Sequence, residues 1–199
     1  MLRVGVLALQ GDFREHAATV RSLGADVVEV RLPKHLEALD AFIIPGGEST
    51  TIGRLAVLYG LVEPMRDAIG AGLPVLGTCA GMIILASGTL EGDQPQLGAL
   101  DVVVRRNAFG RQVDSYEAPI EVAGWSEPMV GVFIRAPWIA KAGDDVEVLA
   151  SVEDADTGES HPVFVRQGTV LATAFHPELT QDTRVHEMLL SMAAAAKED

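Results

Sequence analysis

Short apolar runs alternate with segments of helical periodicity along the first half of the chain. An apolar run is typical of a buried strand, whereas apolar residues that recur every three or four positions are typical of an amphipathic helix. The predicted strands are Leu2 to Leu9, Asp26 to Val30, Ala41 to Ile44 and Val75 to Thr78. The predicted helices follow Gln10-Gly11, begin at about Thr51, run from about Val62 to Ala71, and begin at about Ala80. This alternation predicts a parallel sheet with helices on both faces.

The first predicted helix has signals at both ends. Its apolar residues are Phe13, Ala17, Val20 and Leu23. Asp12 is expected to cap the N-terminus, with Glu15 completing a capping box. Gly24 is expected to end the helix.

The pattern changes to short strands after Leu100. They are predicted at Val102 to Arg105, Ala118 to Val122, Val132 to Ile134, Val146 to Val152 and Val163 to Val165, and we expect antiparallel pairing among them. A last strand, Val170 to Phe175, precedes a helix whose apolar face would carry Val185, Met188, Leu189, Met192 and Ala196. The expected fold is therefore α/β: a mostly parallel, flavodoxin-like three-layer sheet with an antiparallel strand extension, in one domain over residues 1–199.

Charge and cysteine content narrow the classes of function. The chain has 28 acidic and 15 basic residues and a formal charge of -13, so it would repel nucleic acid on average. No apolar run is long enough to cross a membrane, and charged residues follow the first strand too soon for a signal peptide. A single cysteine is typical of a protein from a reducing compartment, which predicts a cytoplasmic protein.

That cysteine lies between a predicted strand and a predicted helix. Gly77-Thr78-Cys79-Ala80-Gly81 has the Gly-x-Cys-x-Gly pattern of a nucleophile elbow, in which glycines allow a sharp turn and close backbone approach. The N-terminus of a helix also favours the thiolate. The alternative is an ordinary glycine-rich turn with a buried thiol.

A nucleophilic cysteine needs a base and a group that orients the base. His176 follows the last predicted strand, so it would emerge at the same sheet edge as Cys79, and Glu178 is two residues away. Cys79, His176 and Glu178 therefore form a candidate catalytic triad. We expect structural roles for the other histidines, two in helices and two in loops: His16, His186, His35 and His161.

Acyl transfer also requires donors for an oxyanion. The candidates are the backbone N–H of Ala80 and a donor from Gly46-Gly47, which could equally be a simple tight turn. The sequence has no zinc ligand cluster and no phosphate-binding loop, so no metal and no cofactor is predicted.

These residues resemble the class I glutamine amidotransferases, whose triad is a cysteine on such an elbow and a His-x-Glu pair. Four further motifs resemble the glutaminase subunits of pyridoxal 5'-phosphate synthase within that class. They are Leu7-Ala8-Leu9-Gln10-Gly11-Asp12-Phe13, Pro45-Gly46-Gly47-Glu48-Ser49-Thr50-Thr51, Arg106-Asn107-Ala108-Phe109-Gly110-Arg111-Gln112 and Phe133-Ile134-Arg135-Ala136-Pro137. The resemblance spans the whole chain.

The resemblance implies that Cys79 attacks the side-chain amide of L-glutamine, that His176 protonates departing ammonia, and that Glu178 orients His176. It implies a substrate site formed by Gly47, Glu48, Ser49, Arg106, Ile134 and Arg135. It also implies a partner, the synthase subunit that accepts the ammonia, and a role for Gln10-Gly11 at the oxyanion site.

Two rival hypotheses remain at this point. One is a glutaminase subunit of another synthase, such as imidazole glycerol phosphate synthase, and Glu48-Ser49-Thr50 argues against it. The other is a non-catalytic redox or stress module in which Cys79 is a sensor, and the pairing of His176 with Glu178 argues against that.

Overall fold

A seven-stranded sheet forms the centre of the computed structural model, which describes residues 1–92, 94–106, 115–154 and 157–198. Its strand order is β10-β11-β12-β4-β3-β1-β2. The strands from β12 to β2 are parallel, whereas β10, β11 and β12 pair antiparallel. The bounds are β1 Arg3–Leu7, β2 Asp26–Val30, β3 Ala41–Ile44, β4 Val75–Thr78, β10 Glu147–Glu153, β11 Ser160–Gln167 and β12 Val170–Thr173.

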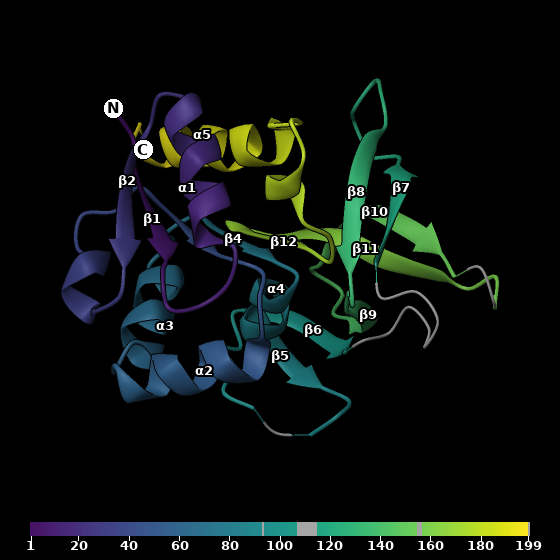
Figure 1. Cartoon of the computed structure of the whole chain (residues 1–199), viewed down its shortest axis with the longest axis horizontal. Helices are drawn as coiled ribbons and strands as arrows, with labels where there is room; N and C mark the ends of the chain where they lie inside the picture. The colour runs from purple at the N-terminus through teal and green to yellow at the C-terminus, as the bar shows by residue number, and fades with distance from the viewer. Residues whose placement is uncertain (93, 107–114, 155–156, 199) are drawn as a thin grey trace.

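Helices cover both faces of this sheet (Figure 1). On one face lie α1 (Phe13–Ser22) and α5 (Arg184–Ala196), and on the other lie α2 (Ser49–Leu58), α3 (Val62–Gly70) and the short α4 (Ala80–Leu85). The described residues also include the 3-10 turns η1 (Pro33–Leu36) and η2 (Pro177–Leu179). The mostly parallel three-layer arrangement confirms the predicted α/β class. Within the described part of the chain, no helix has the length and apolar character needed to cross a membrane.

Among the described residues, the strands between α4 and β10 form two small sheets. One contains β5 (Ala86–Thr89), β6 (Leu100–Arg105) and β9 (Trp138–Ala142), and the other pairs β7 (Ser115–Ile120) with β8 (Met129–Ile134). The pairs β7–β8 and β10–β11 are antiparallel as predicted, and β6 pairs antiparallel with β9 but parallel with β5. The sequence pattern predicts neither β5 nor β9, because both segments are short and carry small or polar residues without clear alternation.

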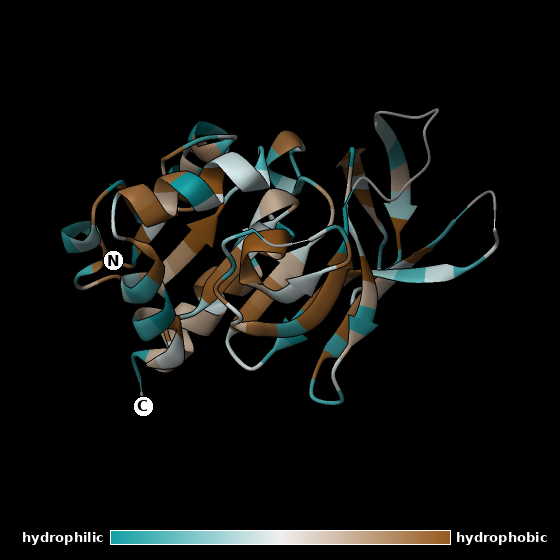
Figure 2. Ribbon diagram, turned by 90° about the horizontal axis from the view of Figure 1, so that it is seen from below, coloured by the Kyte–Doolittle hydropathy of each residue, from teal (hydrophilic) through white to brown (hydrophobic). Residues whose placement is uncertain are grey.

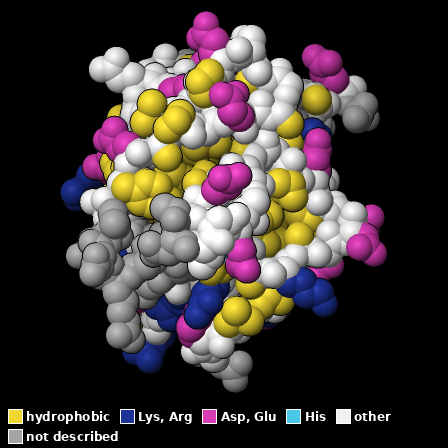
Figure 3. Space-filling model, turned by 90° about the vertical axis from the view of Figure 1, so that its right-hand side faces the viewer, with side chains coloured by type: hydrophobic (Ala, Val, Ile, Leu, Met, Phe, Trp, Pro, Cys, Tyr) yellow, Lys and Arg dark blue, Asp and Glu magenta, His cyan; other side chains and the backbone are white. Residues whose placement is uncertain are grey.

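Continuous apolar runs correspond to the strands that are buried on both faces. Every residue of β3, β4 and β12 is buried, as expected for central parallel strands covered by helices. Figure 2 shows apolar strands between helices whose outer surfaces are more polar. Hydrophobic side chains also gather on the face shown in Figure 3, and Val130 of β8 and Val148 of β10 are exposed.

The N-termini of α1 and α2 differ from the prediction. The Asp12 side chain makes no capping hydrogen bond, so the predicted capping box is wrong, and its carboxylate instead faces His176. The helix α2 begins at Ser49, earlier than expected. Glu48 caps it, because its carboxylate accepts hydrogen bonds from the backbone N–H groups of Thr50 and Thr51.

The buried face of α5 also differs from the predicted one. Val185 and Leu189 are buried as expected, but Ala196 is exposed, and Met188 and Met192 are only partly buried. The other buried residues of this helix are His186 and Ala193. His186 has a polar partner on α1, a contact that apolar periodicity cannot reveal.

Two glycines allow α4 to lie against the sheet. A Cβ atom on Gly81 would overlap the carbonyl oxygen of Ile44 in β3, and one on Gly77 would crowd Leu85 and the backbone of Gly81. The glycines of the elbow therefore permit close packing between β4, β3 and α4, and this packing positions Cys79.

We expect Gly81→Ala to lower the free energy of unfolding by about 1–3 kcal/mol, the usual cost of overpacking. Gly70→Ala is the matched control, since Gly70 ends α3 and a Cβ there meets nothing within 4 Å. That substitution should be neutral or stabilise by about 0.5–1 kcal/mol. Urea unfolding of both variants tests this, and equal effects would contradict the role of close packing.

Candidate active site

Cys79 occupies a strained turn between β4 and α4. Its φ of 48° and ψ of -103° lie in a region that residues with a Cβ rarely adopt. The backbone N–H of Cys79 donates to the Thr173 carbonyl at the end of β12, at 2.8 Å, which ties the turn to the neighbouring strand. The side chain is largely buried, and Sγ lies 3.9 Å from the Ile134 carbonyl oxygen. Such strain is typical of a nucleophile elbow.

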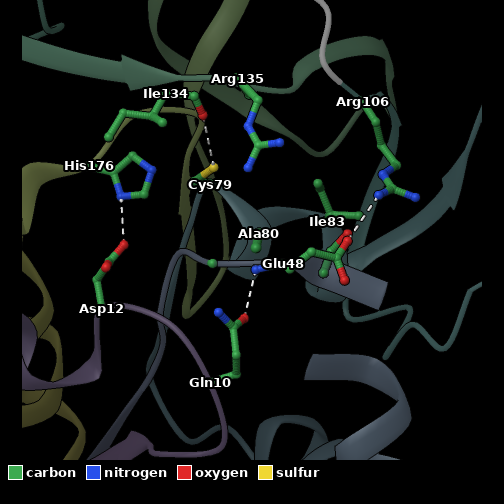
Figure 4. A pocket seen from close by; sticks show the side chains of 12 residues that line it. Gln10, Asp12, Glu48, Cys79, Ala80, Ile83, Arg106, Ile134, Arg135 and His176 are labelled. Carbon is green, nitrogen blue, oxygen red and sulfur yellow. Dashed lines mark hydrogen bonds and ion pairs between the residues drawn. The ribbon is translucent and has the colours of Figure 1, made fainter. Parts of the chain in front are cut away.

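His176 follows β12 and lies beside Cys79 (Figure 4). Its backbone N–H donates to the Val132 carbonyl of β8 at 2.9 Å, so the antiparallel β7–β8 pair helps to hold it. Its Nδ1 atom lies 2.8 Å from Glu178 Oε1, which leaves Nε2 as the ring nitrogen for the sulfur. The structure therefore brings the three candidate triad residues together.

The charge state of His176 follows from its two partners. Burial alone lowers the pKa of its imidazole, but the hydrogen bonds to Cys79 and Glu178 outweigh burial and raise the pKa to about 10. His176 is consequently protonated at neutral pH, held between a sulfur and a carboxylate. An imidazolium in this place can donate a proton to a leaving group.

Glu178 lies behind His176 in η2 and is 6% exposed. Burial raises the pKa of its carboxyl, yet the contacts with His16 and His176 outweigh that effect and hold the pKa below the ordinary value. Glu178 is therefore ionised, and its charge lies between the two histidines. It does not line the cavity, so its place is behind the reacting atoms.

Asp12 adds a second carboxylate that the sequence analysis does not assign to the site. Its Oδ2 lies 3.4 Å from His176 Nδ1, and its side chain is partly exposed to solvent. Desolvation raises the pKa of Asp12, the His176 cation lowers it in part, and nearby Glu178 raises it further. The available signal was its position shortly after β1, whose carboxyl end lies at the same sheet edge as Cys79.

A cavity of about 350 Å³ opens in front of Cys79 (Figure 4). Its walls come from β8 and from the segments that follow β1, β3, β4, β6 and β12. The lining residues are Gln10, Asp12, Gly47, Glu48, Ser49, Cys79, Ala80, Ile83, Arg106, Ile134, Arg135 and His176. All of the substrate-site residues predicted from the sequence are among them, while Asp12 and Ile83 are additions.

The charged side chains of the cavity have defined neighbours. Glu48 caps α2, and its Oε1 lies 3.3 Å from Arg106 Nη2. Burial raises the pKa of Glu48, but the capping hydrogen bonds and Arg106 outweigh it and lower the pKa, so the carboxylate is ionised. Arg135 has a φ of 42°, which places it in a strained turn after β8. The remainder of the motif that begins at Arg106 lies outside the described residues.

The predicted oxyanion donors occupy different places. Ala80 and Gly47 line the cavity, but Gly46 does not. The Gly46 carbonyl accepts a hydrogen bond from the backbone N–H of Asp12 at 3.1 Å, and the N–H of Glu48 donates to Gln10 Oε1 at 2.7 Å. Gln10 therefore holds the glycine loop, and Gly47 and Ala80 are the candidate donors that face the cavity.

Of the four remaining histidines, His16 and His186 are fully buried, whereas His35 and His161 are not. His161 belongs to strand β11 and stacks on Trp138, so its predicted place in a loop is wrong. His35 lies in η1, where Nδ1 accepts the backbone N–H of Arg31. His16 and His186 lie in helices as predicted. They are fully buried, and His16 contacts Glu178, which their spacing in the sequence does not indicate.

One group among the described residues could offer three ligands to a cation. Asp12, His176 and Glu178 have ligand atoms within 4.8 Å of one another. A metal ion there would have to replace the hydrogen bond between His176 Nδ1 and Glu178 Oε1. These groups fit an ion-paired cluster better, because each carboxylate already faces the His176 cation.

Known proteins that are similar to this chain in sequence and in structure are glutamine amidotransferases. Residues 6–195 match the SNO glutamine amidotransferase family. The chain is 56% identical over 197 residues to pyridoxal 5'-phosphate synthase subunit PdxT of Frankia alni, covering 98% of this chain and 96% of that protein. It is 59% identical to the PdxT subunit of Frankia casuarinae, over 94% of this chain and 93% of that protein. A solved glutamine amidotransferase structure is 52% identical to this chain and has a TM-score of 0.89. The match covers 96% of this chain and 98% of that one.

The lowered pKa of Glu178 predicts the direction of a pH effect on stability. Because its folded-state pKa lies below the unfolded value, its contribution is present above about pH 4.5 and is lost as pH falls further. In Glu178→Gln this titration is absent, so the free energy of unfolding should fall less steeply below that pH. Urea unfolding across the acidic range measures both slopes.

Glu63→Gln is the control for this experiment. Glu63 pairs with Arg66 at the surface, where an ion pair contributes little. In Glu63→Gln the free energy of unfolding should fall with decreasing pH as steeply as in the unmodified chain. The assignment fails if Glu178→Gln shows the same slope as well.

Proposed function

The chain belongs to the SNO glutamine amidotransferase family, and we propose that it is the glutaminase subunit of a pyridoxal 5'-phosphate synthase. In this role it hydrolyses L-glutamine to glutamate and ammonia and delivers the ammonia to a partner synthase subunit. The observation that carries the chemistry is the contact of a strained cysteine with a protonated histidine, itself paired with a buried carboxylate, beside a small cavity.

The geometry supports a two-stage acyl transfer. In the first stage the Cys79 thiolate attacks the side-chain carbonyl carbon of glutamine, and the C–N bond breaks as the His176 imidazolium gives its Nε2 proton to the departing nitrogen. This releases ammonia and leaves a glutamyl thioester.

In the second stage neutral His176 takes a proton from water, and the water oxygen attacks the thioester carbon. The C–S bond breaks, which restores the Cys79 thiolate and the His176 imidazolium, and the new carboxyl group loses its proton to solvent to give glutamate. Glu178 stabilises the cationic form of His176.

The oxyanion that forms in each stage needs donors in front of Cys79. The backbone N–H of Ala80, at the start of α4, and the N–H of Gly47 are the proposed donors, because both residues line the cavity. A donor at a helix N-terminus also carries the favourable end of the helix dipole.

Glutamine is a small zwitterion with an amide, and the walls of the cavity contain both signs of charge. We assign its α-carboxylate to Arg106 and Arg135, since a guanidinium can bind a carboxylate with two hydrogen bonds. We assign the α-ammonium and the amide to Glu48 and Ser49, which line the cavity together with Ile134 and Gly47. Glu48 also orients Arg106 through their ion pair.

Residues 1–199 are proposed to form a single glutamine amidotransferase domain. The support for this is one hydrophobic cluster that includes residues of the central sheet, of β6, of β8 and of β9. We further propose that the protein works in the cytoplasm, without a cofactor and without a bound nucleic acid, in accord with its single cysteine and its charge of -13.

Cys79→Ala should abolish glutamate release from glutamine. Alanine keeps the Cβ atom, so the strained backbone of the elbow and the fold should be retained, and the thermal midpoint should change little. Glu178→Gln should reduce turnover less severely, because His176 remains. A coupled glutamate assay measures both, and normal turnover in Cys79→Ala would refute the mechanism.

A synthase subunit of pyridoxal 5'-phosphate synthase from the same source should stimulate glutamate release by the chain. The comparison needs the chain alone, the mixture, and the mixture with Cys79→Ala as the blank. A glutamine-like alkylating analogue should label Cys79 in the mixture, and excess glutamine should protect it. Peroxide sensitivity of Cys79 without protection by glutamine would instead indicate a redox sensor.

A further inference from the structure

We propose that His16 is a positioning residue for Glu178, and that His186 fixes the orientation and tautomer of His16. The three side chains form a buried polar row behind the catalytic pair, in which His16 hydrogen-bonds to His186 and faces Glu178. This inference rests on the proposed function, since Glu178 orients His176 only if the triad acts in catalysis.

The row joins elements that are far apart in the chain. Nδ1 of His16, in α1, lies 2.9 Å from Nε2 of His186, in α5. On its other side, His16 Nε2 lies 3.0 Å from Thr78 Oγ1 of β4 and 3.4 Å from Glu178 Oε2 of η2. Both histidines are 0% exposed, and so is the Glu178 side chain.

The neighbours of His16 determine which nitrogen carries its proton. Glu178 is an ionised carboxylate and can only accept hydrogen bonds. An unprotonated Nε2 on His16 would therefore set one lone pair against another in a buried place. We therefore place a proton on Nε2, which faces Thr78 and Glu178.

The proton of His186 is located by the surroundings of its own ring. His186 Nδ1 has no hydrogen-bond partner among the described residues, so we place the proton of this ring on Nε2, which donates to Nδ1 of His16. The opposite arrangement would bury an unpaired N–H of His186, which costs more than an unpaired acceptor of the same ring. Burial also lowers the pKa of His186 to about 3, so it stays neutral.

The row has a consequence for Glu178. His176 engages Oε1, whereas Oε2 has no hydrogen-bond partner among the described residues and faces His16 Nε2 at 3.4 Å. With both oxygens opposed by histidine donors, the carboxylate plane cannot turn away from His176. Loss of the His16 donor would free this rotation and leave half of a buried charge uncompensated.

Two substitutions of His16 separate positioning from packing. Gln places its amide nitrogen near the position of Nε2, so His16→Gln can still donate to Glu178. Asn places its amide near Nδ1, so His16→Asn can pair with His186 but cannot reach Glu178. Val20→Ala is the matched control, since Val20 is another fully buried residue of α1 and has no polar side-chain atom.

We expect His16→Asn to lower kcat for glutamine on the order of tenfold, with KM nearly unchanged, as for the loss of partners that orient metal-binding histidines elsewhere. His16→Gln should keep kcat within about threefold of the unmodified chain. The assay is glutamate release with the synthase subunit present. Val20→Ala should lower the thermal midpoint without changing kcat.

The pH profile gives a readout that packing alone does not change. The titratable groups that face the row are Glu178, His176 and Asp12, with Cys79 beyond His176. Without the His16 donor the pKa of Glu178 rises, so the acidic limb of kcat/KM should move to higher pH in His16→Asn. It should stay in place in His16→Gln and in Val20→Ala.

Histidine tautomers measured by nitrogen NMR on the unmodified chain provide the second test, which needs no variant to fold. We expect the proton on Nε2 in both His16 and His186. A proton on His186 Nδ1, equal kcat in His16→Asn and the unmodified chain, or equal losses in His16→Asn and His16→Gln would each overturn the proposal. Absence of glutamine hydrolysis in the unmodified chain counts instead against the proposed function. In that case the NMR tautomers of His16 and His186 still test the arrangement of the row.

Discussion

One buried negative charge, the carboxylate of Glu178, governs the groups around Cys79. Glu178 is almost fully enclosed, and a carboxylate in such a place is costly unless cations or donors oppose it. His176 pairs with one of its oxygens and becomes protonated as a result, so the buried carboxylate sets the charge state of the residue that faces the sulfur. The same charge explains why the core contains two further histidines where apolar side chains would otherwise pack.

The fold brings these groups to one edge by two separate means. Parallel pairing of β4 with β12 aligns their carboxyl ends, so the Cys79 elbow and the segment that starts with His176 are neighbours. The backbone N–H of Cys79 bonds to Thr173 across this pair. Helices α1 and α5, which share one face of the sheet in Figure 1, then supply the histidines behind Glu178. The sheet positions the reacting atoms, and the helices compensate the charge that supports them.

The front of the site has a different character. Glu48 and Arg106 pair at the wall of the cavity, and Arg135 and Asp12 also line it, so a small polar molecule meets charges of both signs. These groups are more exposed than the row behind His176, and their mutual attraction is weaker in solvent. A substrate can therefore exchange partners with them while the contacts of Glu178 are kept. Such a division suits a reaction in which the substrate changes charge and the triad keeps its geometry.

Local patterns in the sequence determined the central strands, the elbow and the triad. The run Val75 to Thr78 is buried on both faces, the glycines around Cys79 mark a sharp turn, and parallel pairing must place the ends of such strands at one edge. Only the tertiary structure decided which side chains became partners, because those contacts join residues that are distant in the chain. Asp12 resembles a helix cap in sequence but turns to His176, and His16 and His186 look like isolated helical histidines although they meet across 170 residues. Periodicity reports which face of an element is apolar, but hydrogen bonds between distant elements form only when the tertiary structure brings them together.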